Sequence, residues 1–177
     1  MTIMYHTTLV VIVVFCTAAH AVEVGDLYKA LNTSETLWMM KRNYTRVNHT
    51  CVGATRIDLN LTDYKFNQTF MNNTKEESSV LYAKLGCDML HEYMNVSKIQ
   101  GQNGTQYTLQ FWNDSAKCGI LTFPQRSRNL PGCELYAWDS YVNETSDGCE
   151  EAYRKICTGN ASVVYFNNCT KEVSNIC

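Results

Sequence analysis

The sequence predicts an all-β domain built as an antiparallel barrel or sandwich. Short segments whose side chains alternate in character, or that are rich in β-branched and aromatic residues, recur along the whole chain. Turn residues separate these segments, and one amphipathic helix interrupts them near the C-terminus. The many short segments and the turns between them are typical of an antiparallel barrel or sandwich, and the helix is an addition to that pattern.

A short helix is expected at the start of the domain, over residues 24–31. The candidate strands that follow it cover residues 36–44, 51–59, 64–71, 80–85, 90–96, 106–112, 117–123, 133–141 and 161–166. Asn103 and Gly104 predict a two-residue hairpin turn because both tolerate positive φ, and residues 71–74 predict another reversal.

The later helix is expected over residues 147–157. Cys149, Tyr153, Ile156 and Cys157 share one stripe of this helix. We therefore expect the helix to pack on the outside of the sheet, where cysteines at both of its ends could fasten it.

The N-terminal residues predict export. Residues 9–18 form an apolar stretch that is too short to span a bilayer as a helix, and a small-x-small cleavage site of Ala19, His20 and Ala21 follows it. We interpret residues 1–21 as a signal peptide and residues 22–177 as one mature domain. The protein is therefore expected to be secreted and extracellular, without a membrane anchor.

Cysteine usage agrees with export. The chain has nine cysteines, and removal of the leader with Cys16 leaves eight, which predict four disulfides in an exported protein. They are Cys51, Cys87, Cys118, Cys133, Cys149, Cys157, Cys169 and Cys177. No metal site is expected, because there is no CxxC pair and the mature chain keeps only the histidines at 49 and 91.

N-glycosylation sequons are unusually frequent, and a glycosylated asparagine must face solvent. The candidate sites are Asn32, Asn43, Asn48, Asn60, Asn67, Asn72, Asn95, Asn103, Asn113, Asn143, Asn160 and Asn168. We expect a glycoprotein whose surface is largely covered by sugar, or an Asn-rich chain in which only some of these sites are used.

Two classes of function are disfavoured. With 15 Lys and Arg against 17 Asp and Glu and no block of like charge, the chain is not expected to bind nucleic acid. A hydrolase is also not expected, since the sequence has no GxSxG elbow and no HExxH motif. We expect neither catalysis nor a cofactor.

The sequons predict which side chains point into the sheet, because alternate residues of a strand share a face. If Asn67 points outward, Tyr64, Phe66, Gln68 and Phe70 point inward. If Asn43 points outward, the inward residues of its strand are Trp38, Met40, Arg42 and Tyr44. At Asn113 the rule conflicts with hydrophobicity, because Tyr107, Leu109 and Phe111 would share its outward face.

The stretch CELYAWDSY, residues 133–141, places a carboxylate among aromatic rings. At period two, Glu134, Tyr136 and Trp138 share one face, and Leu135 and Ala137 share the other. Inward rings on several strands could form either a filled core or a lined cavity, and composition does not choose between them.

Several short motifs, taken in order, resemble the salivary lipocalins of ticks, specifically the histamine-binding protein family. They run from Leu27-Tyr28-Lys29-Ala30-Leu31 through Thr50-Cys51-Val52-Gly53, Phe70-Met71-Asn72-Asn73, Cys118 and Glu134-Leu135-Tyr136 to Cys149 and Cys169. The resemblance implies an eight-stranded up-and-down antiparallel barrel, with an entering helix and a C-terminal helix packed outside.

The resemblance also implies two disulfides, Cys51 with Cys169 and Cys118 with Cys149. The remaining cysteines are not covered by it. Their positions suggest Cys133 with Cys157, since the helix could run back along the strand that begins at Cys133, and Cys87 with Cys177 follows by elimination.

The function implied by this resemblance is sequestration: a scavenger in tick saliva that removes a small host inflammatory mediator and so serves immune evasion. The amine-binding sequence pattern of the family that the chain resembles reads Cys-Asp, then Glu-Leu-Trp/Tyr, then Cys. The chain keeps Glu134 and Tyr136, but Gly119 stands where the aspartate should be, and Ala83 and Val47 stand at other acidic positions.

Because one buried carboxylate holds an ammonium less well than several do, we expect a lipid mediator, such as a leukotriene or a fatty acid, rather than histamine. Arg42 could meet its carboxylate, or it could be a solvated residue near the mouth of the barrel. The side chains expected around the ligand are Glu134, Tyr136, Tyr44, Tyr107, Phe111, Trp38, Phe66, Phe70 and Arg42. The alternative is a glycoprotein that binds a host protein through its loops, with the barrel only a scaffold.

Overall fold

The computed structural model describes residues 25–125, 130–143 and 147–170. The predicted signal peptide and Cys177 lie outside the described residues.

Within these ranges, no helix is long and apolar enough to cross a bilayer. The same residues contain no group of His, Cys, Asp and Glu side chains placed to hold a metal ion.

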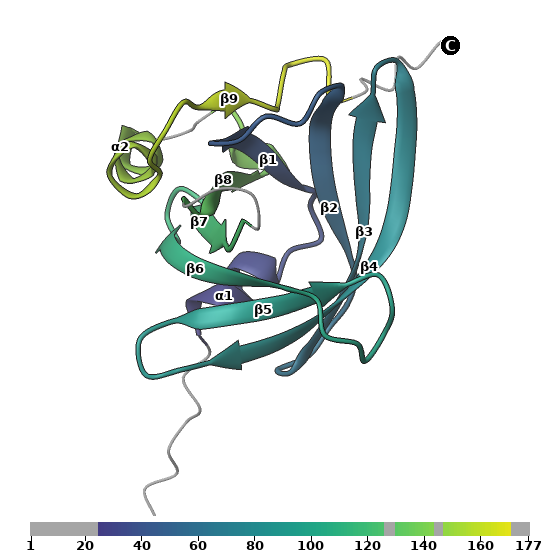
Figure 1. Ribbon diagram of the computed structural model, residues 1–177, viewed down its shortest axis with the longest axis vertical. Helices are drawn as coiled ribbons and strands as arrows, with labels where there is room; N and C mark the ends of the chain where they lie inside the picture. The colour runs from purple at the N-terminus through teal and green to yellow at the C-terminus, as the bar shows by residue number, and fades with distance from the viewer. Residues whose placement is uncertain (1–24, 126–129, 144–146, 171–177) are drawn as a thin grey trace, which may run out of the picture.

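Eight antiparallel strands close into a barrel, which confirms the expected fold class (Figure 1). They are β1 (Leu37–Arg42), β2 (His49–Leu59), β3 (Asp63–Asn72), β4 (Lys75–Cys87), β5 (Glu92–Ser97), β6 (Thr105–Asn113), β7 (Cys118–Phe123) and β8 (Gly132–Trp138). From β2 to β8 each strand pairs with the next, and β1 closes the cylinder by pairing with both β8 and β2. The topology is therefore up-and-down.

The helix α1 (Asp26–Leu31) lies at one end of the barrel. Its side chains Leu27 and Leu31 are buried in the interior cluster, which also contains Phe66 and Leu121. The Nε1 of Trp138 donates a hydrogen bond to the carbonyl oxygen of Ala30 at 3.0 Å. The entering helix therefore covers this end of the interior.

The helix α2 (Asp147–Ile156) packs on the outside of the barrel, as its stripe predicts (Figure 1). Cys149 and Tyr153 form a buried cluster with Ile120 and Leu135, and both of those strand residues are fully buried. The outer faces of β7 and β8 are apolar because this helix covers them.

A short strand, β9 (Ser162–Val163), pairs with the last residues of β1. It is much shorter than the predicted segment 161–166. Because β1 and β2 pair only at Leu37 and Trp38, the chain around β9 occupies the space where these strands diverge. There Val164 is fully buried against Met39 and Val52.

Among the described residues, three disulfides fasten both ends of α2 and the segment that ends near Cys169 to the barrel. Cys51 is joined to Cys169, Cys118 to Cys149, and Cys133 to Cys157, which are the pairs expected from the resemblance and from position. Cys87 is exposed and has no disulfide partner among the described residues. Its expected partner, Cys177, lies outside them.

A β-bulge in β1 corrects the predicted facing of that strand. The register with β8 shifts between Met39 and Lys41, so the alternation of faces moves by one residue. The prediction that Trp38 and Met40 point inward is wrong: both pack with Tyr165 on the outer side. Arg42 lies beyond the bulge and does face inward, opposite Glu134.

A second shift, between Leu109 and Phe111 in β6, resolves the conflict at Asn113. Before the shift, Tyr107 and Leu109 belong to the interior. After it, Phe111 packs in the outer cluster beneath α2. The expectation that Phe111 lines the cavity is therefore wrong, because one additional residue reverses the alternation.

The turns agree only in part with prediction. The reversal at residues 71–74 is confirmed, with Asn73 at φ 56 between β3 and β4. The two-residue hairpin at Asn103 and Gly104 is wrong, because β5 and β6 are joined by a longer loop whose positive φ lies at Gly101. Gly104 is needed for a close approach instead, since a Cβ there would lie 1.7 Å from the carbonyl oxygen of Val96.

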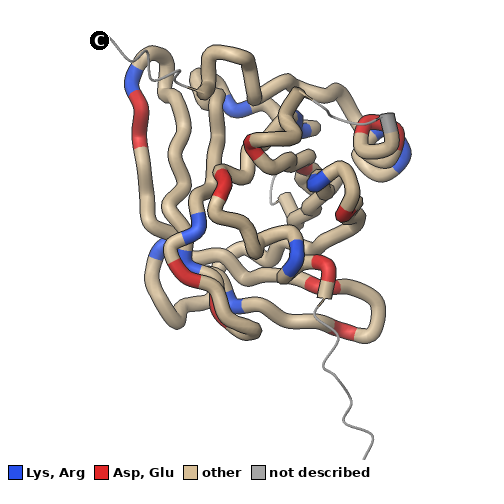
Figure 2. The backbone as a smooth tube through the Cα atoms, turned by 180° about the vertical axis from the view of Figure 1, so that it is seen from behind, with Lys and Arg blue, Asp and Glu red and all other residues tan. Residues whose placement is uncertain are grey.

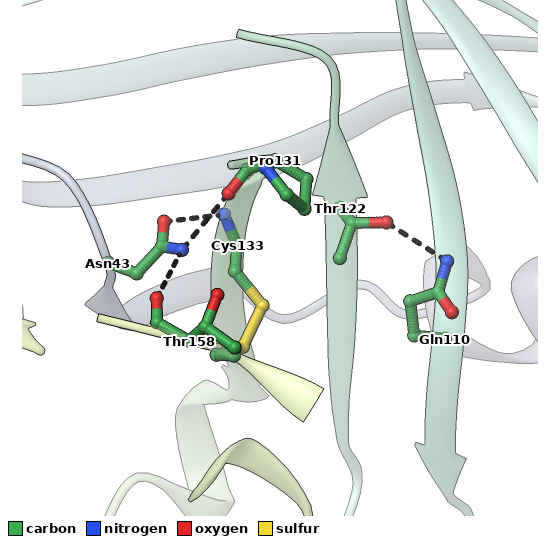
Figure 3. The surroundings of a disulfide bond; sticks show 7 residues. Asn43, Gln110, Thr122, Pro131, Cys133 and Thr158 are labelled. Atoms are coloured by element: carbon green, nitrogen blue, oxygen red, sulfur yellow. Dashed lines mark hydrogen bonds between the residues drawn. A yellow bond between two sulfur atoms is a disulfide. The ribbon is translucent and has the colours of Figure 1, made fainter. Parts of the chain in front are cut away.

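Asn43 is buried, at 8% exposure, which corrects its assignment as a solvent-facing sequon. Its Nδ2 donates to the carbonyl oxygens of Pro131 at 3.0 Å and Thr158 at 2.9 Å, and its Oδ1 accepts from the backbone N–H of Cys133 at 2.9 Å (Figure 3). Asn43 points away from the barrel interior, but the segment after α2 covers it. A glycan does not fit this placement.

The other sequons lie at accessible positions. Those that are exposed are Asn32, Asn48, Asn60, Asn72, Asn103, Asn143, Asn160 and Asn168, and those that are half-buried are Asn67, Asn95 and Asn113. Acidic and basic residues are scattered over the described backbone without forming a large region of one sign (Figure 2).

Candidate functional site

A cavity of about 110 Å³ lies inside the barrel. Its apolar wall includes Leu31, Leu37, Met39, Val52, Phe66, Leu81, Met94 and Leu121. Its polar and aromatic lining consists of Tyr44, Arg46, His49, Tyr64, Gln68, Tyr107, Glu134 and Tyr136. Most of these side chains belong to strands, and the connection between β1 and β2 contributes Tyr44 and Arg46.

Glu134 is the acidic side chain of the cavity and is only 2% exposed. The hydroxyl of Tyr136 donates to its Oε2 at 2.8 Å, and the hydroxyl of Tyr44 donates to its Oε1. Burial raises the pKa of Glu134, and the two tyrosine hydroxyls and then Arg42 and Arg46 oppose that rise. Both carboxylate oxygens therefore already accept a hydrogen bond from the protein.

The tyrosines around Glu134 remain protonated donors. Burial, followed by repulsion from the Glu134 carboxylate, raises the pKa of Tyr44, Tyr107 and Tyr136 well above the ordinary value. The ring of Phe123 contacts both Tyr44 and Tyr107, with centroids 5.5 and 5.0 Å away. The rings are thus held in place around the carboxylate.

Arg42 is buried beside this group, at 4% exposure. Its Nη2 donates to the backbone carbonyl oxygens of Arg46 and His49, each at 2.8 Å, and its guanidinium lies 5.3 Å from the ring centroid of Tyr44. No ion pair with a carboxylate occurs at Arg42 within the described ranges. The buried cation is therefore held mainly by backbone dipoles.

His49 closes the polar end of the cavity. Its ring stacks on Phe70, with centroids 4.0 Å apart, and its Nδ1 lies 3.3 Å from Nη1 of Arg42. Burial, followed by the charges of Arg46 and Arg42, lowers the pKa of His49 to about 4. The imidazole is therefore neutral at physiological pH.

Of the side chains expected around a ligand, five line the cavity: Glu134, Tyr136, Tyr44, Tyr107 and Phe66. Arg42 lies behind the lining, bonded to two of its backbone carbonyls.

Three others do not line the cavity. Phe70 supports it through the stacked ring of His49. The bulges in β1 and β6 turn Trp38 and Phe111 outward, and Nε1 of Trp38 donates to Asp139 at 2.6 Å.

Sequence reasoning missed Arg46 and His49 as cavity residues. Arg46 lies in the connection between β1 and β2, and His49 is the first residue of β2, so strand periodicity does not mark the facing of either one. Only the tertiary contacts show that His49 is buried, although it lies inside a sequon.

The space around Gly119, where the resemblance implies an aspartate, is already filled. A Cβ added to Gly119 would lie 3.0 Å from the ring of Trp112 and 3.0 Å from the carbonyl oxygen of Phe111. The Trp112 ring, which is 6.1 Å from that of Trp138, fills the place where a side chain at 119 would project. Val47, at another of these positions, is 78% exposed.

A comparison with models of known protein families identifies the family of this chain. Residues 17–171 match the model of the family described as tick histamine binding protein. The chain belongs to this family. Membership in the histamine-binding family agrees with the closed barrel and with the two disulfides that the sequence resemblance implies. No curated protein matches the chain in sequence.

Solved structures share the barrel of this histamine-binding family member. Japanin from Rhipicephalus appendiculatus, bound to cholesterol, has a TM-score of 0.59 and 12% identity, covering 78% of this chain and 97% of its own. The AM182 serotonin complex has a TM-score of 0.63 and 16% identity, covering 83% of this chain and 94% of its own. At such identities the likeness shows the fold alone.

Proposed function

We propose that the protein is a secreted scavenger that holds a small amphipathic ligand in its barrel and does not transform it. The cavity supports this proposal because it combines an apolar wall with a cluster of polar groups at one end. The disulfides support an extracellular location, reached after removal of residues 1–21.

The charges at the polar end favour a ligand with a carboxylate over an amine. Arg42 and Arg46 contribute two cations, whereas Glu134 contributes one carboxylate whose oxygens already accept hydrogen bonds. An ammonium that loses its hydration needs carboxylates to offset the loss, and here it would face the Arg46 guanidinium in the lining and the charge of Arg42 behind it. This charge arrangement is the observation that carries the proposal.

Cavity size sets a second condition on the ligand. A volume of about 110 Å³ is smaller than the roughly 300–1,000 Å³ of common small-molecule sites. Met39, Met94 and Arg46 line it, and such long flexible side chains can change rotamer to lengthen the space. We therefore propose a fatty acid or a leukotriene whose chain displaces these side chains, in preference to histamine.

The family supports sequestration as the kind of function. Among the solved structures with this fold, one holds cholesterol and another is a serotonin complex, so barrels of this shape accept chemically different guests. The ligand of this chain therefore depends on its own cavity residues.

Isothermal titration calorimetry on the purified glycoprotein tests the proposal. The ligands are histamine, serotonin, leukotriene B4 and saturated fatty acids of increasing chain length. We expect carboxylates to bind more tightly than amines, and their affinity to rise with chain length until the cavity is filled. Stronger binding of histamine than of any carboxylate would reverse the ligand class, and binding of none would refute the scavenger function.

Glu134→Gln separates the two ligand classes. This change removes the charge and keeps the shape, so it should abolish amine binding and leave fatty-acid affinity nearly unchanged. Arg46→Gln is the matched variant on the cationic side and should weaken fatty-acid binding about tenfold, as expected for a charge-assisted hydrogen bond. Equal effects of both changes on both ligand classes would contradict the proposed orientation.

A second candidate function, binding of a host protein through loops, is favoured by one observation. Met89 and Leu90, in the turn between β4 and β5, are 100% and 83% exposed. If this turn is a contact surface, the double variant Met89→Ser and Leu90→Ser should lose crosslinking to purified plasma proteins and keep its ligand affinity. Unchanged crosslinking would exclude the turn as the contact.

A further inference from the structure

Two buried nitrogen atoms near the polar end of the cavity have no hydrogen-bond partner among the described residues. They are Nε of Arg42 and Nε2 of His49. The other polar atoms of these two side chains are engaged: Nη2 of Arg42 binds two backbone carbonyls, and Nη1 faces Nδ1 of His49.

The contact between Arg42 and His49 fixes the tautomer of the imidazole. A guanidinium can only donate, so Nδ1 of His49 must accept the hydrogen bond from Nη1. The ring is neutral because its pKa is lowered to about 4 by burial and by the neighbouring arginines. Its single proton is therefore on Nε2, and that atom is a donor.

A buried donor without an acceptor costs free energy comparable to a lost hydrogen bond, so such groups are uncommon unless something satisfies them. Nothing in the described residues supplies an acceptor here. The carboxylate of Glu134 already receives the hydroxyls of Tyr44 and Tyr136. This end of the cavity therefore has more donors than acceptors.

The ring of His49 is also held in a fixed orientation. It stacks on Phe70 with an interplanar angle of 25°, and it lines the same cavity as Arg46, Tyr44 and Glu134. A ligand head group in this part of the cavity meets an immobilised imidazole together with the Arg46 guanidinium. Such a preorganised donor loses little freedom when a ligand binds. It therefore favours head groups that can accept its hydrogen bond.

We propose that His49 is the specificity-determining residue of the cavity and that its Nε2–H donates to a carboxylate oxygen of the bound ligand. The inference rests on the proposed scavenger function and deepens it by naming the side chain that distinguishes a carboxylate from an amine. Arg42 acts as the positioning residue, since its guanidinium holds the imidazole in the tautomer that donates.

Calorimetry with laurate and dodecylamine tests this assignment, because the two probes share a chain length and only the carboxylate can accept a hydrogen bond. His49→Phe keeps a ring that can stack on Phe70 and removes the donor. We expect it to weaken laurate binding about tenfold and to leave dodecylamine binding unchanged or tighter. Since Asn48-x-Thr50 remains a sequon after this change, glycosylation at Asn48 is not affected.

Two variants control for folding and position. His49→Gln retains an amide donor and should recover part of the laurate affinity that His49→Phe loses. His91→Phe changes an exposed histidine at the turn after β4 and should have no effect on either probe. Circular dichroism and thermal unfolding establish that each variant is folded before titration.

The outcomes separate the two proposals. If the wild type binds carboxylates and His49→Phe binds both probes as the wild type does, or loses both equally, the role of His49 is overturned and the scavenger function stands. If the wild type binds neither these probes nor the mediators, both proposals fail. In the wild type, ¹⁵N chemical shifts should place the proton of His49 on Nε2, and a proton on Nδ1 would overturn the inference directly.

Discussion

The hydroxyl of Tyr136 donates a hydrogen bond to Oε2 of Glu134 at 2.8 Å along one strand of the barrel. Alternate residues of a strand share a face, so both side chains point into the interior. Tyr44, from the connection after β1, donates to the other carboxylate oxygen. The acidic side chain among the described cavity residues is thus held by two donors of the protein itself.

Tyr136→Phe should destabilise the protein by about 2 kcal/mol, because it removes a donor from a buried carboxylate. The pKa of Glu134, already raised by burial, should rise further. Urea unfolding at neutral pH measures the loss. The matched control is Tyr107→Phe, since Tyr107 lines the same cavity and its hydroxyl makes no hydrogen bond to the described residues. Equal losses in the two variants would contradict the role of the hydrogen bond.

Asn43 should be unglycosylated in the secreted protein, because its amide is buried and makes three hydrogen bonds. Glycopeptide mapping checks this directly. Asn43→Ala should lower the free energy of unfolding by about 3 kcal/mol, at about 1 kcal/mol for each hydrogen bond lost. Asn160→Ala removes an exposed sequon and should change stability little. A glycan found on Asn43 would mean that the segment around Thr158 is displaced.

The disulfide between Cys133 and Cys157 should hold the C-terminal end of α2 against β8. Replacing both cysteines by alanine should cost about 3.5 kcal/mol, the loop-closure value for a sequence separation of 24. Hydrogen exchange should then increase in α2. The corresponding double alanine variant at Cys51 and Cys169 should leave α2 protected, since that bridge fastens a different segment. Unchanged exchange in α2 after loss of the first bridge would contradict this assignment.

Gly119→Asp should not create an amine site, although it restores the aspartate of the family's pattern. The new Cβ would lie 3.0 Å from both Trp112 and the Phe111 carbonyl oxygen, so we expect a loss of about 1–3 kcal/mol from overpacking. Thermal unfolding and histamine calorimetry measure the two effects. Adding Trp112→Ala should relieve the clash with the ring. Gain of histamine binding by Gly119→Asp alone would show that the Trp112 ring moves aside readily.

His49 makes stability depend on pH. Its folded-state pKa of about 4 lies below the ordinary value of 6.5, so between these values the unfolded chain binds a proton that the folded chain does not. The contribution of His49 to the free energy of unfolding is therefore fully present above pH 6.5. It falls as the pH drops toward 4, by at most about 1.4 kcal/mol per pH unit.

Urea unfolding at pH 7 and pH 4.5 isolates this contribution when the wild type is compared with His49→Phe. The variant should lose less stability on acidification than the wild type. Glu134, whose pKa is raised, contributes with the opposite sign, but it is present in both proteins. Identical pH dependences would show that His49 does not titrate in this window. His91→Phe, at an exposed position, should behave like the wild type.

Much of the fold follows from local sequence. Alternating segments predicted the barrel strands, and the stripe through Cys149 and Tyr153 predicted that α2 packs on the outside. The order of short motifs predicted the family that the comparison shows. The period of two in residues 133–141 placed Glu134 and Tyr136 on one face, and the resemblance predicted that this face lines the cavity. These features are readable because each depends on residues only a few positions apart.

Only the tertiary structure decided which other side chains surround the cavity. The period-two rule for strand facing fails across the bulges in β1 and β6. Whether a strand contains such an extra residue depends on the partners packed against it. That is why Trp38 and Phe111 turn outward and Arg42 turns inward. Asn43 likewise became a buried amide because Pro131 and Thr158, distant in sequence, supply the carbonyls that it binds.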